Sequence, residues 1–236
     1  MRKRAKKEFC AAAALLFAFV VWTLLLRIVD VGAIGPRGSA VGFATWNGAF
    51  HKLTGTNMTL YTVTDWLGLV PIGVAFSFAV LGLAQWIRRK SFLRVDKSIL
   101  ALGGFYLLVM GVYALFELVV VNRRPVLIDG YLEASYPSST TMLVLCAMPT
   151  AMMQLHARIR KKLLQYGTNF ILLGFTAFMV VGRLLSGVHW LSDILGGGLL
   201  SAGLVMAYHA TLCLLRTEKS PETGQVSGDF SKIQRI

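Results

Sequence analysis

The chain has 236 residues, of which 56% are hydrophobic and only 15% charged, and its mean hydropathy is +0.63. Soluble domains carry roughly 25% charged residues, so this composition excludes an ordinary soluble protein and predicts an integral membrane protein of one domain. The net charge of +13 does not indicate nucleic-acid binding. The basic residues lie in short clusters between apolar runs, as they do in the cytoplasmic loops of membrane proteins.

Six apolar runs follow one another along the chain, each close to the ~20 residues that cross the hydrocarbon core of a bilayer. We expect the first to be a retained helix rather than a signal peptide, because it is too long and no small-residue cleavage site follows it. The sequence thus predicts an all-α, polytopic membrane protein: a six-transmembrane helix bundle over residues 1–215 and a disordered cytoplasmic tail over 216–236. The predicted spans are 9–29, 66–87, 98–121, 138–156, 166–185 and 191–215.

The connection 30–65 is the longest polar segment between the spans, and it is rich in glycine. Phe43, Trp46, Phe50 and Leu53 recur in it at helical spacing, which predicts a short amphipathic helix on the outer leaflet. A loop that packs on the helix bundle fits the same residues equally well.

Basic residues divide unequally between the two sides of the predicted bundle. Eighteen of the 24 Lys and Arg residues lie before the first span, in the second and fourth connections, or after the last span, whereas four lie in the other connections. By the positive-inside rule, the larger group is cytoplasmic. Both termini are therefore expected on the inner side of the cell membrane, and the segments around Arg124, Ser138 and His189 on the extracytoplasmic side.

This topology brings polar groups from four span ends to one depth near the outer face. Residues 123–125 follow the third span, Ser138 opens the fourth, Arg183 ends the fifth, and His189 and Asp193 begin the sixth. Arginines bind phosphate oxygens through paired donors that stay charged. The imidazole of His189 can attack phosphorus, and Asp193, one helical turn away, can hold its other ring nitrogen. The cluster therefore predicts a site for phosphoryl transfer.

Three short motifs resemble, in order, the signatures of the type-2 phosphatidic acid phosphatase and vanadium haloperoxidase superfamily. Gly182-Arg183-x5-His189-x3-Asp193 is similar to the third signature, Ser-Arg-x5-His-x3-Asp. Arg124-Pro125 is similar to the end of the first, Lys-x6-Arg-Pro, and Pro137-Ser138 to the opening of the second, Pro-Ser-Gly-His. The resemblance covers roughly residues 30–215. It implies a membrane lipid phosphatase with a phosphohistidine intermediate at His189, with Arg124, Ser138 and Arg183 around the phosphate and Asp193 orienting the nucleophile.

The same resemblance implies neither a metal nor another cofactor for the membrane phosphatase branch. Cys10, Cys146 and Cys213 lie within the predicted spans and form no CxxC motif, so we interpret them as small core residues. The expected partners are a lipid phosphate or diphosphate substrate and the bilayer.

Two positions depart from the family pattern. The Lys of the first signature falls on Glu117, and the His of the second, which protonates the leaving group in the family, falls on Thr140. General acid assistance is worth about 10²–10⁴-fold. A lipid alkoxide leaves poorly without it, whereas a phosphate group with a second pKa of about 6 can leave unprotonated. We therefore expect a preference for lipid diphosphates, with polyprenyl diphosphate as the first choice.

Several neighbours of these motifs have more than one interpretation. Glu117 is interpreted either as a substitute acid or as a buried ion-pair partner of the nearby arginines. Arg123 is compatible with a phosphate ligand and with a solvated loop charge. Ser139 and Thr140 are expected to cap or pack the fourth helix, with phosphate contact as the alternative. Glu133 lies on the loop between the third and fourth spans. It either contacts the substrate headgroup or has no role in the site.

Three kinds of function fit these observations. The first is a lipid phosphatase or diphosphatase, and the second is a phosphotransferase that passes the phosphoryl group to a lipid or sugar acceptor. The third is a non-catalytic protein that binds lipid phosphates, which the two missing family residues favour. A transporter is disfavoured, because transporters keep their ionisable groups near mid-membrane, whereas these groups lie at one face.

Overall fold

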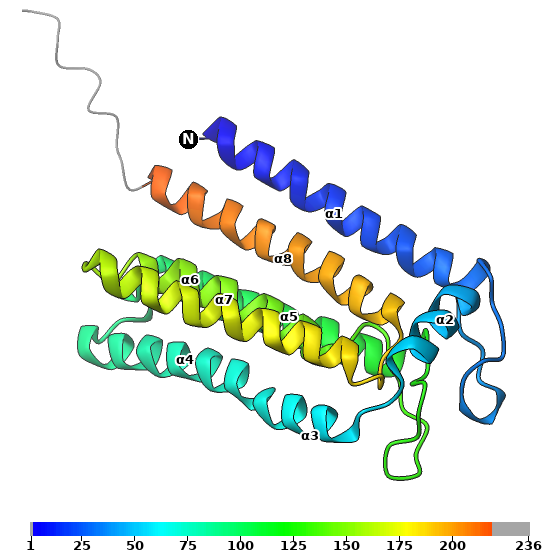
Figure 1. Ribbon diagram of the computed structural model, residues 1–236. Helices are drawn as coiled ribbons and strands as arrows, with labels where there is room; N and C mark the ends of the chain where they lie inside the picture. Colours follow the sequence, from blue (N-terminus) through cyan, green and yellow to red (C-terminus); the bar gives the residue numbers. More distant parts are fainter. Residues whose placement is uncertain (1, 219–236) are drawn as a thin grey trace, which may run out of the picture.

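The structure is a bundle of long helices packed side by side (Figure 1). The computed structural model describes residues 2–218, and within them the regular structure consists of α-helices, short 3-10 turns and isolated bridge pairs, without a strand. The all-α prediction is thus confirmed. The helices are α1 (Arg2–Ile28), α2 (Ala44–Thr54), α3 (Met58–Leu67), α4 (Leu69–Arg89), α5 (Lys97–Leu118), α6 (Ser139–His156), α7 (Lys162–Leu185) and α8 (Leu191–Glu218), and the 3-10 turns are η1 (Pro36–Gly38) and η2 (Phe92–Arg94).

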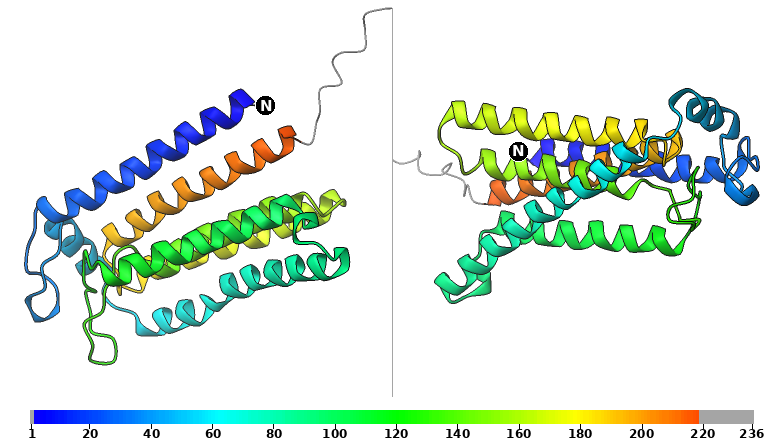
Figure 2. Two further views of the ribbon diagram at one scale, coloured as in Figure 1. Left: turned by 180° about the vertical axis from the view of Figure 1, so that it is seen from behind. Right: turned by 60° about the horizontal axis from the view of Figure 1, so that its bottom comes forward.

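Helix α6 is the most enclosed element of the bundle. It packs against α7, α8 and α4, while α1 runs beside α8 along most of its length in both views (Figure 1 and Figure 2). Nine of the 18 residues of α6 are buried. Val144, Cys146 and Met148 are fully enclosed and contribute to the apolar core. The core therefore sits around α6, with the other long helices outside it.

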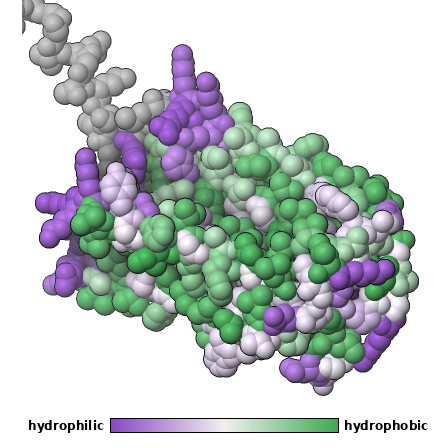
Figure 3. All heavy atoms as spheres, in the orientation of Figure 1, coloured by the Kyte–Doolittle hydropathy of each residue, from purple (hydrophilic) through white to green (hydrophobic). Residues whose placement is uncertain are grey.

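The sides of the bundle are apolar, and polar side chains gather at its two ends (Figure 3). Five helical segments are long and apolar enough to cross a membrane. Large apolar side chains such as Phe17, Phe76 and Leu107 point outward from them. The chain is therefore a multi-pass membrane protein. The five segments are Lys3–Ile28, Met58–Arg89, Lys97–Leu118, Lys162–Leu185 and Leu191–Arg216.

The predicted number of six spans is not confirmed, because α6 does not meet the same criteria of length and apolarity. It has 18 residues, with Ser139 and Thr140 in its first turn, Pro149 inside it and Gln154 and His156 near its end. Since α6 is surrounded by other helices, its polar groups need not face hydrocarbon. Gln154, for example, is buried and donates a hydrogen bond to the carbonyl of Ser98 over 3.1 Å.

Several helix boundaries differ from the prediction, among them the start of the second span and the end of the sixth. The second span was expected to begin near residue 66, but α3 begins at Met58, where the side chain of Asn57 accepts a hydrogen bond from the Leu60 N–H over 2.9 Å. Such an N-cap stabilises a helix start. Asp65 therefore lies in the last turn of α3 rather than in a polar loop. At the other end, α8 continues to Glu218, and the rest of the predicted tail lies outside the described residues.

A helix, α2, does form in the connection between α1 and α3, whereas its position on a membrane surface stays a prediction. Trp46 and Leu53 are exposed on it, and its buried residues are Ala44 and the polar Asn47, which is 1% exposed. The Nδ2 of Asn47 donates to the Gly42 carbonyl over 2.8 Å and to Ser192 Oγ over 2.9 Å, and its Oδ1 accepts from the Ser192 N–H over 3.1 Å. Asn47 thus anchors α2 to the first turn of α8.

We expect Asn47→Ala to destabilise the protein by about 1–3 kcal/mol, because the backbone N–H of Ser192 and the carbonyl of Gly42 would remain buried without the hydrogen bonds to Asn47. Thermal unfolding of the detergent-solubilised protein measures this loss. Lys52→Ala, at an exposed position of the same helix, is the control and should leave Tm unchanged. An Asn47→Ala protein as stable as the wild type would contradict the anchoring role.

Candidate active site

The loop between α7 and α8 carries His189, and a glycine fixes its path. Gly187 has a φ of +67°, and a Cβ on it would lie 1.9 Å from the carbonyl oxygen of Gly55, so no other residue fits without a shift of the backbone. The Asn57 N–H donates to the Ser186 carbonyl over 2.9 Å. The loop is thereby held against the start of α3, and His189 points inward with 3% of its surface exposed.

The two nitrogens of His189 have different partners. Nδ1 lies 3.1 Å from the carbonyl oxygen of Ser135, and Nε2 lies 3.3 Å from Nη1 of Arg124. Because a carbonyl only accepts, Nδ1 carries the proton, and the lone pair of Nε2 accepts from the guanidinium. Burial lowers the pKa of His189 to about 4, and the Arg124 charge adds to this effect while Asp193 opposes it. The imidazole is therefore neutral at neutral pH and holds its lone pair on Nε2.

Asp193 was expected to orient His189, but the closest acceptor for Nδ1 is the Ser135 carbonyl. The Oδ2 of Asp193 lies 3.8 Å from Nδ1 and accepts a hydrogen bond from the Trp190 N–H over 3.0 Å. Its Oδ1 accepts from Nδ2 of Asn122 over 3.1 Å. Asp193 is fully buried, so its negative charge acts on the imidazole at short range while its oxygens hold the surrounding backbone.

Arg183 and Arg124 flank one aromatic ring at the site. The guanidinium of Arg183 lies 4.9 Å from the centre of the Tyr61 ring, and that of Arg124 lies 6.0 Å from it. Arg183 is 1% exposed and places Nη2 3.2 Å from Oδ1 of Asp65. Arg124 places Nε 2.9 Å from Oε2 of Glu133. Two arginines from distant parts of the chain thus lie beside His189, each next to a carboxylate.

The ion pair between Glu117 and an arginine is not found. Asp65 pairs with Arg183 instead, and Glu133 pairs with Arg124. Glu117 is exposed near the end of α5 and lines the pocket that contains His189. Helix α5 ends at Leu118, so the chain leaves the helix before it reaches Arg124. Glu117 therefore does not share a helix with Arg124.

Ser138 lies at the N-cap of α6 and is fully buried. Its backbone N–H donates to the Asp193 carbonyl over 3.1 Å, so this N–H is not free to bind an anion. The hydroxyls of Ser135 and Ser138 and the Nε of Arg183 are buried without a hydrogen-bond partner among the described residues. Unpaired buried donors cost about 1–3 kcal/mol each. Their position around His189 favours an anionic ligand with several acceptor oxygens.

The remaining predicted residues lie at the edge of this cluster or outside it. Ser139 lines the His189 pocket, a small cavity of about 20 Å³. Thr140 faces α3, since a Cβ on Gly68 would lie 3.6 Å from its methyl group. Arg123 is exposed and donates from Nη1 to the Leu132 carbonyl over 2.8 Å, so it holds its own loop.

Tyr61 and Asp65 are site residues that sequence reasoning missed. They stand four residues apart in α3 and so share one face of that helix. One signal could have indicated them: Asp65 is the sole acidic residue between Asp30 and Asp96. A carboxylate at the edge of a long apolar run requires a partner, and Arg183 is that partner.

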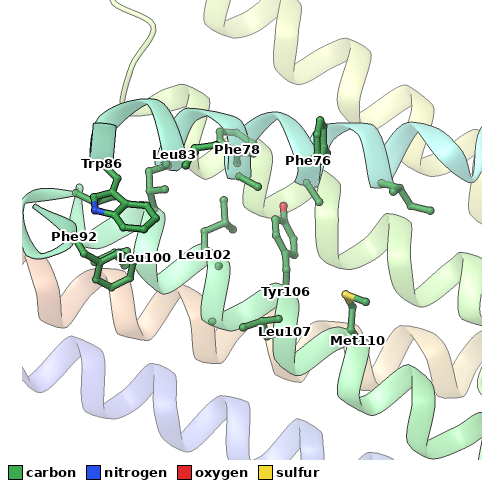
Figure 4. Close-up of a pocket in the computed structure, with 18 residues that line it drawn as sticks. Phe76, Phe78, Leu83, Trp86, Phe92, Leu100, Leu102, Tyr106, Leu107 and Met110 are labelled. Atoms are coloured by element: carbon green, nitrogen blue, oxygen red, sulfur yellow. The ribbon is translucent and has the colours of Figure 1, made fainter. Parts of the chain in front are cut away.

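A larger cavity lies elsewhere. It has a volume of about 610 Å³ and opens between α4 and α5, lined by apolar side chains such as Phe76, Trp86 and Leu107 (Figure 4). The Tyr106 hydroxyl in it lies 3.0 Å from Oγ1 of Thr150. No residue lines both this groove and the His189 pocket. The groove is lined almost entirely by apolar side chains, so the candidate site is the small pocket that contains His189.

Comparisons with known proteins place the chain in a family. The model of the PAP2 superfamily matches residues 72–216, which include Arg124, Ser138, Arg183 and His189. Among solved structures, a transmembrane PAP2 type phosphatidylglycerolphosphate phosphatase from Bacillus subtilis is 19% identical; the match covers 90% of this chain and 98% of that one, with a TM-score of 0.49. The comparison with curated proteins gave no match.

The depressed pKa of His189 predicts how stability changes with pH. An unfolded histidine titrates near pH 6.5, whereas His189 in the folded protein titrates at about 4. Between these values the unfolded chain binds more protons, so stability is full above pH 6.5 and falls as the pH is lowered to 4. The contribution of this residue is on the order of 3 kcal/mol.

Thermal unfolding of wild type and His189→Gln between pH 7 and 4 measures this contribution. Glutamine does not titrate, so the variant should lose less stability over this range. Parallel curves for the two proteins would show that the pKa of His189 does not differ between the folded and unfolded states.

Proposed function

Because the chain belongs to the PAP2 superfamily, whose model matches more than half of its length, we propose that it is a membrane phosphatase that removes phosphate from a lipid phosphate. The observation that carries this proposal is the buried, neutral imidazole of His189, with Nδ1–H donated to the Ser135 carbonyl and the Nε2 lone pair facing Arg124. A nucleophile for phosphorus needs an unprotonated nitrogen of this kind.

The reaction proceeds in two displacements. The Nε2 lone pair of His189 attacks phosphorus, and the bond to the bridging oxygen breaks with its electron pair on the leaving group. The phosphohistidine carries a positive imidazole ring, which the buried carboxylate of Asp193, 3.8 Å from Nδ1, stabilises. Water then attacks phosphorus, the N–P bond breaks, the water proton leaves with inorganic phosphate, and the neutral imidazole is restored.

Arg124 and Arg183 bind the phosphate oxygens in this proposal. Each guanidinium already lies beside a carboxylate, Glu133 or Asp65, so the substrate competes with these carboxylates for the arginines. The side chains of Glu133 and Asp65 are about half exposed, at 45% and 54%. They can turn toward water when a phosphate of higher charge enters. The hydroxyls of Ser135 and Ser138 are further donors to the same anion.

We further propose that the substrate is a lipid diphosphate, such as a polyprenyl diphosphate. Thr140 stands where the family has the histidine that protonates the leaving group, and threonine does not act as an acid near neutral pH. Attack on the terminal phosphorus of a diphosphate releases a lipid monophosphate, which leaves without a proton because its second pKa is about 6.

The site is proposed to face the extracytoplasmic side of the cell membrane, with both termini in the cytoplasm. The unequal division of the basic residues supports this orientation. His189, Arg124 and Ser138 lie at the end of the bundle that carries few basic residues.

The first experiment measures release of inorganic phosphate from lipid monophosphates and diphosphates by the purified protein in detergent. The wild type should release phosphate. The rate of His189→Ala should be lower by at least about 10³-fold, because the variant lacks the nucleophile. Binding of lipid diphosphates without release would indicate a non-catalytic binder. Phosphate found on an added lipid or sugar acceptor instead of in solution would indicate a phosphotransferase. The variant must keep the elution volume of the wild type for the comparison to hold.

The second experiment restores the family's acid. Thr140→His should raise the rate on lipid monophosphates by at least about tenfold while changing the diphosphate rate less, because only the alkoxide leaving group needs the proton. Thr140→Val, which supplies no acid, is the matched control. Equal turnover of monophosphates and diphosphates by the wild type would overturn the diphosphate preference.

A further inference from the structure

Three side chains with metal-binding atoms meet at the end of the bundle opposite His189. Glu8 lies near the start of α1, and His209 and Cys213 lie one turn apart near the end of α8. The carboxylate oxygen, the ring nitrogen and the sulfur all lie within 4.8 Å of one another. Figure 1 shows these two helix ends side by side, far from the α7–α8 loop.

The helices that carry the three side chains are packed closely. Ala5 and Ala12 of α1 are buried on either side of Glu8, so Glu8 shares the face that contacts α8. A Cβ on Gly203 would lie 2.8 Å from the side chain of Leu16, so the glycine lets the two backbones approach each other. Small residues at such a seam fix the distance between the helices. The ligand atoms are therefore held by rigid backbone on both sides.

We propose that Glu8, His209 and Cys213 bind a divalent transition-metal ion of the zinc class. Zinc takes nitrogen, sulfur and carboxylate oxygen in a tetrahedral arrangement. Bond lengths of about 2.0–2.3 Å then place neighbouring ligand atoms roughly 3.5 Å apart. Nδ1 of His209 already lies 2.9 Å from Oε2 of Glu8. Side-chain rotations are thus sufficient to reach this geometry, and water supplies the fourth ligand because all three residues are only partly buried.

The charge around the cluster is compatible with such an ion. Arg4 places Nε 3.0 Å from Oε1 of Glu8, which leaves Oε2 for the metal. A carboxylate and a thiolate together offset the double charge of the ion, so the site adds no net positive charge to the basic segment 2–7. The sulfur and imidazole ligands select zinc over magnesium or calcium, which prefer oxygen.

The metal ties the first helix to the last at the end remote from the reaction site. Both helices belong to segments that can cross a membrane, and a bond between them opposes their separation. Its binding should therefore change stability and the reactivity of Cys213 rather than the phosphoryl-transfer step. It is independent of the proposed function.

The test uses the full chain in detergent, reduced and stripped with a chelator. Maleimide labelling, read at each cysteine by peptide mass spectrometry, is followed with and without excess zinc. Zinc should slow labelling of Cys213 at least tenfold and leave the exposed Cys10 unchanged, and magnesium should change neither. Tm should rise with zinc. After desalting, elemental analysis should find one zinc for each chain.

Variants decide whether the three residues act together. Glu8→Gln and His209→Gln should lose the protection of Cys213 and the rise in Tm, whereas His156→Gln, an exposed histidine at the end of α6, should keep both. Unchanged Cys213 labelling in zinc, or protection that persists in His209→Gln, would overturn the site. If a variant does not fold, the labelling and the zinc content of the wild type decide the question alone.

Discussion

The site depends on one buried residue, Asp193, that holds three parts of the chain together. Asp193 accepts hydrogen bonds from the Trp190 N–H and from Asn122, and its own carbonyl accepts from the Ser138 N–H. A buried charge is tolerated only when its oxygens are paired. The start of α8, the segment after α5 and the start of α6 therefore take up one relative position, and His189 lies between them.

The second constraint is the balance of charge around His189. Arg124 and Arg183 stand beside the ring of Tyr61, and two like charges so close in a buried place repel each other. Asp65 and Glu133 offset them in the absence of substrate. Both carboxylates are half exposed while the arginines are buried. The two arginine side chains are thus fixed by burial, whereas the carboxylates of Asp65 and Glu133 can move.

The two ends of α8 serve different purposes. Its first turn carries Asp193 and is anchored to α2 by Asn47, whereas its last turns carry His209 and Cys213 beside Glu8 of α1. Between these ends the helix packs along α1 with small residues at the contact. The apolar groove between α4 and α5 is separate from both ends (Figure 4). Polar chemistry is therefore confined to the ends of the bundle.

Hydropathy and spacing in the sequence alone predicted that the chain is helical and lies in a membrane. They also predicted His189, Arg124 and Arg183 as candidate site residues. These features depend on local composition and on motifs of a few residues, which hydrophobic burial and side-chain chemistry control directly. Membership of the family followed from the same motifs. Helix α6 was predicted as a span because its apolar run is similar to the others. The neighbouring helices that enclose its polar ends are not visible in that pattern.

Only the tertiary structure decided which groups surround His189. Tyr61 and Asp65 reach the site from α3, and Glu133 and the Ser135 carbonyl reach it from the loop before α6. No spacing rule connects these two segments with His189. The ion pair considered for Glu117 is not found, because Asp65 and Glu133 pair with the arginines instead, and α5 ends at Leu118 before the chain reaches Arg124. Contacts between distant segments depend on how loops close and how helices pack. The free energy of that packing depends on many residues at once, so no short stretch of the sequence determines it.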